Sequence, residues 1–335
     1  MLRAGVIGLG VGEQHVVGYN SHPDCETVAV CDFSEEKLQS FKNKNPKIKT
    51  TQSSEEILKD PNIDVVSIAS YDNFHFEQIM LALQNNKSVF VEKPMVLFRE
   101  EAIKVREVLS EKSHLRLSSN LILRKYPRFV AIKDLIATGQ LGKIYYMEGD
   151  YLYGRLHKLT EGWRGDIPFY SVVSGGAIHL VDLLLWLTGD SPVEVSAFGN
   201  SICTQGSKFQ HPDFVGALIK FKSGAMAKVT ANFGCVFPHF HGVSIFGNKG
   251  TFKNGFKKGY VYTRRGEAGS VPRRAIETPY PGAKKGDHLR AFINSLAGKA
   301  SADLVTTDEV FGAMSVCFAI EKAMKENAIV KVGYI

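Results

Sequence analysis

Short apolar runs alternate with amphipathic segments along the first 120 residues of the chain. The apolar runs predict strands at residues 3–7, 26–31, 64–69, 88–91 and 114–118. The segments between them predict helices at residues 13–19, 35–42, 54–58 (with Ser53 as its cap), 76–84 and 100–111. Uninterrupted apolar strands separated by helices are typical of a parallel sheet that helices cover on both faces. The pattern therefore predicts an α/β domain with a doubly wound parallel sheet over residues 1–122.

The pattern changes after a predicted hinge at residues 120–127. Longer segments in which apolar and polar residues alternate now predict strands at residues 143–153, 193–198, 214–222, 225–233, 242–246 and 260–264. Helices are predicted at residues 126–137, 288–296 and 308–325. Strands with a period of two, joined by tight turns, are typical of a largely antiparallel open sheet. We therefore expect a second, α+β domain over residues 123–335, whose C-terminal helix could pack back on the first domain.

Composition is that of an ordinary globular protein, with 44% hydrophobic and 22% charged residues among 335. No apolar run approaches the roughly 18 residues that span a bilayer, so no membrane segment is expected. Because the first strand begins at residue 2, we also expect no signal peptide. The five cysteines are widely spaced and include no Cys-x-x-Cys pair. This favours a cytoplasmic protein without a disulfide framework or a zinc site.

The formal net charge of +7 is partly local. Residues 253–285 contain nine Lys or Arg residues and only two acids, Glu267 and Glu277. Two interpretations stay open: a solvated loop face, or a rim that attracts an anionic substrate such as a phosphorylated or nucleotide-linked sugar. Nucleic acid is not an expected partner, because the chain has no helix-turn-helix, zinc finger or stripe of aromatic and basic residues.

A glycine turn lies between the first predicted strand and the first predicted helix. It reads Gly8-Leu9-Gly10-Val11-Gly12, and Asp32 follows 22 residues after Gly10, at the end of the second strand. Such a turn lets a pyrophosphate approach backbone amides at a helix N-terminus, and the acid accepts hydrogen bonds from a ribose diol. The sequence thus predicts that these six residues bind a dinucleotide on a Rossmann sheet. A carboxylate repels a 2′-phosphate, so NAD is favoured, although Ser34 and Lys37 leave some room for NADP.

One position departs from the Gly-x-Gly-x-x-Gly pattern. The last glycine is replaced by Glu13, and Gly12 comes one residue early. We expect a turn that is one residue shorter, with Glu13 facing outward. A glycine turn without a ligand is the alternative, and it would leave the acid at the strand end unexplained.

Polar residues follow two further predicted strands, at Ser70-Tyr71-Asp72-Asn73 and at Glu92-Lys93-Pro94. Ligands of such sheets bind beyond the carboxyl ends of the strands, so these residues should face one crevice with the glycine turn. A lysine held there could polarise the oxygen of a substrate lying over a nicotinamide. The alternative for Lys93 is a surface lysine paired with Glu92.

Residues 162–187 hold the main chemical candidates of the second domain. A helix that opens at Ser174-Gly175-Gly176 carries His179 and Asp182 on one face. A histidine near a helix N-terminus tends to stay neutral and could act as a base; the alternative is a core histidine. Separately, His239 and His241 could place two imidazoles on one strand face. No third ligand is evident, so no metal is expected.

Taken together, these motifs resemble the glucose-fructose oxidoreductase/inositol dehydrogenase/rhizopine-catabolism (Gfo/Idh/MocA) family. The resemblance is carried by Gly8-Leu9-Gly10, Glu92-Lys93-Pro94, the segment from Ser70 to His75, and His179-Leu180-Val181-Asp182. Two positions depart from the family pattern: Tyr71 replaces a proline, and Gly175 stands where the family has the first aspartate of its helix motif.

The resemblance implies roles for individual residues. It implies that the cofactor contacts Ser70, Asn73, His75, Glu92, Lys93 and Asn120. It implies that the substrate contacts Lys93, Arg164 and His179, and that catalysis uses Lys93, His179 and Asp182. It further implies a cis bond between Lys93 and Pro94, and a homodimer or homotetramer formed through the second sheet.

The function expected from these observations is NAD-dependent oxidation of a secondary alcohol in a sugar, cyclitol or sugar derivative. Two alternatives stay open. The first is a non-catalytic NAD-binding regulator, which the glycine at position 175 motivates. The second is an NAD-assisted glycosidase, in which bound NAD is used only transiently.

Overall fold

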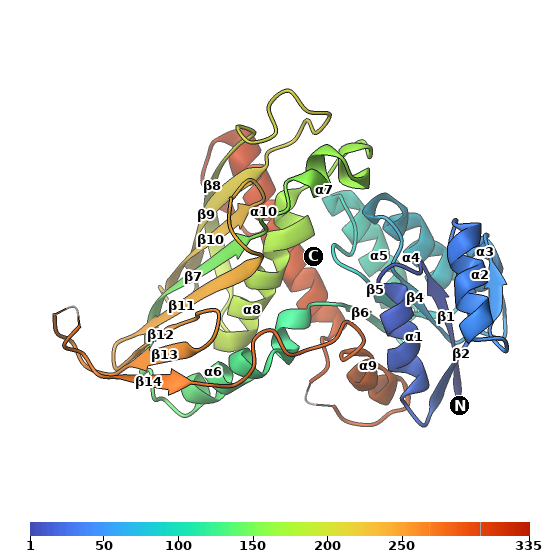
Figure 1. Cartoon of the computed structure of the whole chain (residues 1–335), viewed down its shortest axis with the longest axis horizontal. Helices are drawn as coiled ribbons and strands as arrows, with labels where there is room; N and C mark the ends of the chain where they lie inside the picture. The colour runs from blue at the N-terminus through green and yellow to red at the C-terminus, as the bar shows by residue number, and fades with distance from the viewer. Residues whose placement is uncertain (268, 302) are drawn as a thin grey trace. The chain divides into compact units, whose positions relative to one another are not determined.

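The computed structural model describes residues 1–267, 269–301 and 303–335. They form two compact units, whose chain order can be followed in Figure 1. The first unit holds Met1–Ile122, Lys284–Phe311 and Ile335, and the second holds Leu123–Ala283 and Gly312–Tyr334. Among the described residues, no helix is both long enough and apolar enough to cross a membrane.

The first unit is built on a parallel sheet of six strands. The strands are β1 (Leu2–Ile7), β2 (Cys25–Cys31), β3 (Lys49–Thr51), β4 (Val65–Ile68), β5 (Ser88–Val91) and β6 (Leu117–Ser119). Their order is β3-β2-β1-β4-β5-β6, and every pair is parallel. The predicted doubly wound Rossmann sheet is therefore confirmed. Strand β6 begins three residues later than predicted, because residues 114–116 precede the pairing with β5.

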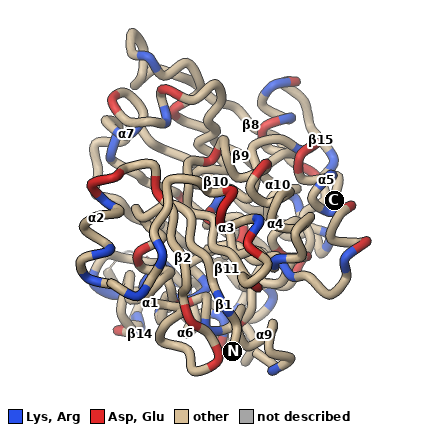
Figure 2. Tube along the Cα trace, turned by 90° about the vertical axis from the view of Figure 1, so that its right-hand side faces the viewer, with Lys and Arg blue, Asp and Glu red and all other residues tan. Residues whose placement is uncertain are grey.

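Helices connect these strands at close to the predicted positions. They are α1 (Gly12–Asn20), α2 (Glu35–Lys44), α3 (Ser54–Leu58), η1 (Asp72–Phe74), α4 (His75–Gln84) and α5 (Arg99–Glu111). A further helix of this unit, α9 (Leu289–Leu296), comes from the later segment Lys284–Phe311. Both signs of charge occur along α2, as Figure 2 shows. Ser34 caps α2, since its hydroxyl accepts a hydrogen bond from the Lys37 amide. The predicted cap at Ser53 is wrong in one respect: its side chain makes no capping hydrogen bond to α3.

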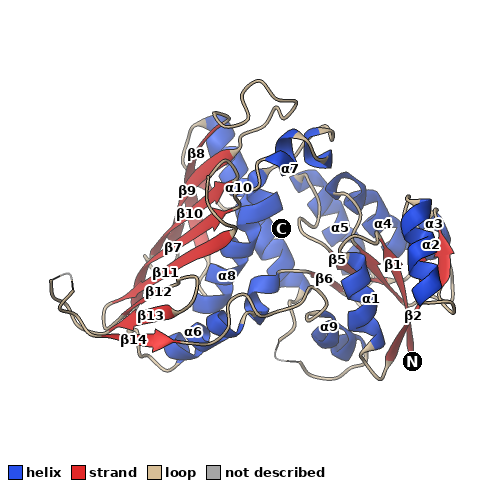
Figure 3. Ribbon diagram, in the orientation of Figure 1, coloured by secondary structure: helices blue, strands red, loops and turns tan. Residues whose placement is uncertain are grey.

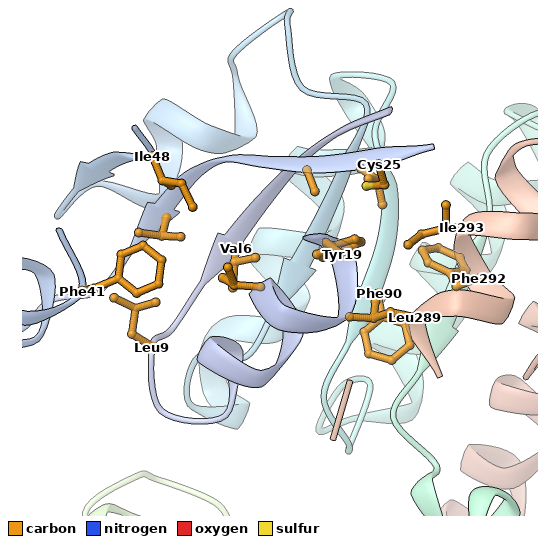
Figure 4. Packing of buried hydrophobic residues seen from close by; sticks show 14 of the residues in the cluster. Val6, Leu9, Tyr19, Cys25, Phe41, Ile48, Phe90, Leu289, Phe292 and Ile293 are labelled. Atoms are coloured by element: carbon orange, nitrogen blue, oxygen red, sulfur yellow. The ribbon is translucent and has the colours of Figure 1, made fainter. Parts of the chain in front are cut away.

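The core of the first unit includes a segment that we expected in the second domain. Figure 4 shows Leu289, Phe292 and Ile293 packed with Tyr19 and Phe90. Helix α9 buries these apolar side chains on the Rossmann core, so the division after residue 122 is incomplete: Lys284–Phe311 returns to the first unit.

The second unit is built on a mixed sheet of nine strands. They are β7 (Ile144–Leu152), β8 (Pro192–Asn200), β9 (Phe214–Phe221), β10 (Met226–Asn232), β11 (Phe240–Gly247), β12 (Thr251–Lys253), β13 (Gly259–Tyr262), β14 (Arg273–Ile276) and β15 (Val330–Lys331). Their order is β14-β13-β12-β11-β7-β10-β9-β8-β15. In the described part of the chain, β10 and β7 pair in parallel and the other neighbours are antiparallel. The predicted, largely antiparallel sheet is confirmed.

One face of this sheet is covered by helices. The helical segments of the unit are η2 (Ile122–Lys125), α6 (Pro127–Ala137), α7 (His157–Thr160), η3 (Trp163–Gly165), a π-helical turn (Val173–Ala177), α8 (Ile178–Thr188) and most of α10 (Thr307–Glu326). Figure 3 shows α6 and α8 on the same side of the sheet. Gly149 of β7 packs against Leu180 of α8. The opposite face exposes Phe198, Leu218 and Met226.

Candidate cofactor and substrate sites

Hydrogen bonds align the carboxyl ends of five neighbouring strands in the first unit. The bonds run from Gly8 N to Cys31 O (2.7 Å), from Ala69 N to Ile7 O (2.8 Å), from Glu92 N to Ile68 O (2.8 Å) and from Asn120 N to Val91 O (3.1 Å). The glycine turn, Asp32, and the loops after β4, β5 and β6 therefore follow one edge of the sheet, as the strand order requires.

Two glycines of the turn are needed for different reasons. Gly8 has a φ of +90°, and a Cβ there would lie 2.3 Å from the carbonyl oxygen of Ala69. Gly12 is buried, and a Cβ there would lie 2.8 Å from Cγ1 of Val6. Gly12 thus permits the close packing of helix on strand that the third glycine of the pattern normally provides, and Glu13 is exposed as predicted.

Open space remains next to the middle of the turn. Gly10 is exposed, and a Cβ built there would have nothing within 4 Å. A pyrophosphate binds to backbone N–H groups at a helix N-terminus, so it needs a position without a side chain at the start of α1. The turn therefore fits the phosphates of a dinucleotide.

Asp32 is held toward the turn by the backbone. Its side chain is almost fully buried, its Oδ2 accepts a hydrogen bond from Leu9 N (2.7 Å) and its Oδ1 accepts one from Ser34 N (2.9 Å). Lys37 Nζ lies 3.6 Å from Oδ2. Two carboxylate oxygens offer about four acceptor positions, so capacity remains for a ribose diol.

An aromatic surface beside Asp32 was not predicted from the sequence. The Phe33 side chain is 66% exposed, and its ring centroid lies 5.7 Å from that of Tyr71. Lys37 Nζ lies 5.6 Å from the same ring. A flat apolar surface next to a ribose-binding acid can stack a purine. The sequence held a signal for it, because an aromatic residue directly follows the acid.

The loop after β5 is fixed by a buried histidine. The bond between Lys93 and Pro94 is cis, as predicted, and Lys93 is half-buried. His75 is fully buried, with Nδ1 2.7 Å from the Pro94 carbonyl oxygen and Nε2 3.3 Å from that of Ser70. His75 therefore joins the loops that follow β4 and β5. Asn73 lies in the loop that follows β4, and its buried Oδ1 has no hydrogen-bond partner among the described residues.

Glu92 and Asn120 belong to a buried polar network. Glu92 Oε1 lies 3.3 Å from His15 Nε2 and accepts a hydrogen bond from Asn120 Nδ2 (2.6 Å). Asn120 Nδ2 also donates to the Lys285 carbonyl (3.0 Å). Burial alone would raise the pKa of the Glu92 carboxyl, but the His15 hydrogen bond, the charge of Lys285 and the Asn120 amide hold that pKa well below its ordinary value. Glu92 is therefore ionised, and its buried contacts anchor the backbone directly before Lys93.

In the second unit, His179 is 4% exposed and lies in α8. The ring of Tyr151 stacks at 6.4 Å from its ring, and that of His241 lies at 6.3 Å. The helical segment that carries His179 begins at Val173, one residue before the predicted opening at Ser174. The π-helical turn Val173–Ala177 runs into α8 without a break, and the amides of Val173 and Ser174 donate hydrogen bonds to Ser171 Oγ (3.1 and 3.3 Å). His179 therefore does not lie in the first turn of the helical segment.

The carboxylate of Asp182 binds an arginine. Arg124 Nε lies 2.9 Å from Oδ2 and 3.2 Å from Oδ1 of Asp182, and Arg124 Nη2 lies 2.5 Å from Oδ1. Both side chains are buried. This forked ion pair ties α8 to the segment that precedes α6. Sequence reasoning missed Arg124, because no motif links it to the helix.

Arg164 forms its own cluster of aromatic contacts. Its Nε donates a hydrogen bond to Tyr170 Oη (3.0 Å), and its guanidinium lies 4.6 Å from the ring centroid of Trp163. Arg164 is half-buried, whereas Tyr170 is buried. Tyr170 was not predicted as a site residue.

A carboxyl group from α10 also reaches this region of the second unit. Ser174 Oγ donates a hydrogen bond to Glu321 Oε1 (3.3 Å). Burial raises the pKa of Glu321 to about 7, against opposing hydrogen bonds from Ser171 and Ser174. Sequence reasoning missed Glu321, which lies 147 residues from Ser174.

His239 and His241 lie 5.0 Å apart by ring centroid, and both rings contact Tyr151. Within the described ranges, no group of three or more His, Cys, Asp or Glu side chains is arranged to hold a metal ion. The two histidines therefore form part of an aromatic cluster on the sheet.

At least three of the nine basic residues at 253–285 are engaged in local contacts. Lys258 pairs with Glu277, the Arg273 guanidinium lies 4.1 Å from the ring of Tyr260, and Arg274 hydrogen-bonds Gln140. These contacts favour the interpretation as a solvated face of β13 and β14.

A Rossmann sheet with a glycine turn and an acid after β2 defines a dinucleotide-binding protein. Comparison with protein families gives a narrower class. Residues 2–120 match the "Oxidoreductase family, NAD-binding Rossmann fold" model, and residues 129–253 match the "GFO/IDH/MocA C-terminal domain" model. The chain therefore belongs to the GFO/IDH/MocA family of NAD-binding oxidoreductases.

Similar proteins include several dehydrogenases. The chain is 27% identical over 257 residues to the myo-inositol 2-dehydrogenase of Thermotoga maritima, with 74% of each chain covered. It is 28% identical over 259 residues to the scyllo-inositol 2-dehydrogenase (NAD(+)) of Bacillus subtilis, covering 75% of this chain and 72% of the relative. Among solved structures, levoglucosan dehydrogenase in complex with NADH aligns over 100% of both chains, with a TM-score of 0.85 and 20% identity.

Proposed function

We propose that this protein is an NAD-dependent dehydrogenase that oxidises a secondary alcohol of a sugar or cyclitol. The family supplies the NAD-binding oxidoreductase class. The substrate class is supported by curated relatives that act on inositols. The observation that carries the proposal is the cofactor edge of the first unit, where an open glycine turn, Asp32 and the Lys93 loop follow neighbouring strands.

The cofactor is assigned to residues along that edge. In this proposal the turn from Gly8 to Gly12 holds the pyrophosphate, and Asp32 accepts the ribose hydroxyls. The amides of Gly10, Val11 and Gly12 are the donors, because those of Gly8 and Leu9 already bond to Cys31 O and to Asp32 Oδ2. Ser70 and Asn73 line the same edge. His75, Glu92 and Asn120 are buried, so we assign them to positioning the loops rather than to direct contact.

Lys93 and His179 are assigned to the reaction, as the resemblance to the family implies. NAD supplies the acceptor for the hydride that leaves the alcohol carbon. The Lys93 ammonium donates a hydrogen bond to the substrate oxygen and stabilises the negative charge that develops there. The His179 imidazole takes the hydroxyl proton. Arg164 binds the substrate, and Asp182 holds α8 through Arg124 rather than exchanging protons.

The test is turnover with NAD and a panel of sugars and cyclitols, followed by reduced-nicotinamide absorbance. We expect at least one polyol to be oxidised, and Lys93→Ala to lower kcat/KM by about 10²–10³-fold while NAD still binds. Lys59→Ala is the matched control, because Lys59 is an exposed lysine paired with Glu55. Unchanged turnover by Lys93→Ala would contradict the site assignment. Tight NAD binding without reduction, or sugar release without net redox, would instead favour the regulator or the glycosidase.

We also propose that the protein assembles as a homodimer or homotetramer and works in the cytoplasm. The exposed face of the second sheet carries Phe198, Leu218 and Met226, which is an apolar surface suited to a second copy. Light scattering of Leu218→Glu against the unaltered chain tests this assembly, with a shift toward monomer expected.

A further inference from the structure

Two adjacent glycines sit in the π-helical turn that leads to His179. A Cβ at Gly175 would lie 2.3 Å from Tyr170 Oη. A Cβ at Gly176 would lie 2.7 Å from the rings of both Phe233 and Tyr151. A side chain at either position would force its aromatic neighbours to shift, because three aromatic residues pack directly against the backbone of the turn. The turn is therefore shaped by this aromatic packing.

The hydroxyl of Tyr170 is the polar part of that packing. It accepts the hydrogen bond from Arg164 Nε (3.0 Å), and the Arg164 guanidinium lies 5.5 Å from the centroid of the Tyr170 ring. A charge-assisted hydrogen bond fixes the phenol more firmly than packing alone does. The half-buried Arg164 thus fixes a buried hydroxyl against the backbone at Gly175.

The same aromatic packing continues to the imidazole. Tyr170 contacts Phe233 (6.3 Å between ring centroids), Phe233 contacts Tyr151 (5.6 Å), and Tyr151 stacks on His179 (6.4 Å). Tyr170 is therefore connected to His179 in two ways: through the backbone of the turn at Gly175, and through the rings of Phe233 and Tyr151. π-Helical turns inside helices often occur at functional sites, where they change the direction of the side chains that follow.

We propose that Tyr170, held by Arg164, is a positioning residue that fixes the π-helical turn and thereby aims the His179 imidazole. The inference rests on the proposed function, in which His179 takes the substrate proton. It also gives a physical reason for glycine at position 175, since the Tyr170 hydroxyl occupies the space that a side chain there would need.

The central experiment removes only the hydroxyl, with Tyr170→Phe. We expect kcat to fall by about tenfold to a hundredfold, because small errors in the placement of a reacting group are costly. The affinity for NAD should be unchanged, and the limb of the pH profile of kcat/KM that reports His179 should shift. Tyr146→Phe is the matched control, since that hydroxyl contacts Glu148 on the second sheet and lies outside the proposed site.

A double-mutant cycle separates positioning from general loss of structure. Arg164→Met also breaks the hydrogen bond, and it does so from a half-buried residue. If the pair acts as one unit, Arg164→Met/Tyr170→Phe should show a kcat no lower than Arg164→Met alone. Additive losses would overturn the proposal, as would wild-type kcat and pH profile in Tyr170→Phe. If Tyr170→Phe fails to fold, the rate of His179 modification in Arg164→Met gives the decisive result, because that rate does not depend on substrate binding by Arg164.

A second readout does not need turnover. The rate at which diethyl pyrocarbonate modifies His179, measured on its peptide by mass spectrometry, reports how firmly the imidazole is held. We expect this rate to rise several-fold in Tyr170→Phe and to stay unchanged in Tyr146→Phe. If the unaltered protein oxidises no polyol, the proposed dehydrogenase function is wrong, and the modification rate alone then decides the role of Tyr170; an unchanged rate rejects it.

Discussion

The two units each contain a glycine-rich turn that leads into a helix, and the two turns are packed in opposite ways. In the first unit, Gly10 faces open space, with nothing within 4 Å of a built Cβ. In the second unit, Gly175 and Gly176 face Tyr170, Phe233 and Tyr151 at less than 3 Å. The first turn keeps its backbone accessible to a ligand, whereas the second lets side chains of the same chain approach. Both turns contain glycine, but the surrounding residues determine whether its backbone is accessible to a ligand or packed against side chains.

The helices after the two turns are also held differently. Helix α8 is fixed by the buried pair of Arg124 and Asp182, and we expect the largest effect where this pair is broken. Arg124→Met leaves a buried carboxylate without the guanidinium, so the free energy of unfolding should fall by about 3–5 kcal/mol. Urea unfolding measures this change.

Two further variants complete that test. Lys220→Met removes one partner of an exposed ion pair with Glu194 and should cost less than about 1 kcal/mol. Arg124→Met/Asp182→Leu should recover most of the loss, because it removes the charge as well as its partner. If Arg124→Met costs no more than Lys220→Met, the pair does not hold α8.

The comparison of the two turns is tested most directly by placing one methyl group in each. Gly175→Ala should lower the free energy of unfolding by about 1–3 kcal/mol, because the new Cβ meets Tyr170 Oη. Gly10→Ala should leave stability nearly unchanged. It should raise the Kd for NAD at least about tenfold, because the methyl group blocks the approach of the pyrophosphate.

Thermal unfolding and calorimetric titration with NAD read out the two variants in parallel. The expected result is a crossed pattern, in which Gly175→Ala loses stability and keeps NAD affinity. Gly10→Ala should do the reverse. Loss of stability in Gly10→Ala, with unchanged NAD binding, would remove the distinction between an open and a closed turn.

The sequence could predict the first turn well and the second poorly, for a physical reason. Gly8 and Asp32 directly follow a strand and Lys93 follows β5 after one residue, so the parallel order of the strands brings them to one edge. Two of the three aromatic partners of the second turn, Tyr151 and Phe233, come from separate segments. Arg124 lies 58 residues from Asp182, and no local period records such a contact.

The same limit applies to parts of the fold. Strands β12, β14 and β15 have two to four residues, which is too short for an alternating pattern to be recognised. Helix α9 was placed correctly along the chain, but its packing in the first unit depends on Leu289, Phe292 and Ile293 meeting a distant core. Local patterns therefore predicted the elements better than they predicted which elements pack together.

The smallest expected effect concerns Glu321, which contacts the second turn through Ser174. Burial raises its pKa from 4.5 to about 7, so the folded state keeps a proton that the unfolded state loses as pH rises above 4.5. The stabilisation of the folded state by protonated Glu321 is complete below pH 4.5 and is lost as pH rises through about 7. Glu321→Gln stays neutral and should avoid this loss. Above pH 7 it should therefore be more stable than the unaltered protein, by about 1 kcal/mol after screening by water.

The difference in Tm between Glu321→Gln and the unaltered protein measures this effect across the pH range. It should be near zero below pH 4.5, grow as pH rises to about 7, and then stay constant at about 3 °C. Glu326→Gln is the matched control on the same helix, because Glu326 is exposed and pairs with Lys322. A constant difference at every pH would mean that Glu321 titrates like an exposed carboxyl. In that case the closed turn would be held by its aromatic packing and the Arg164 hydrogen bond, without a contribution from a protonated acid.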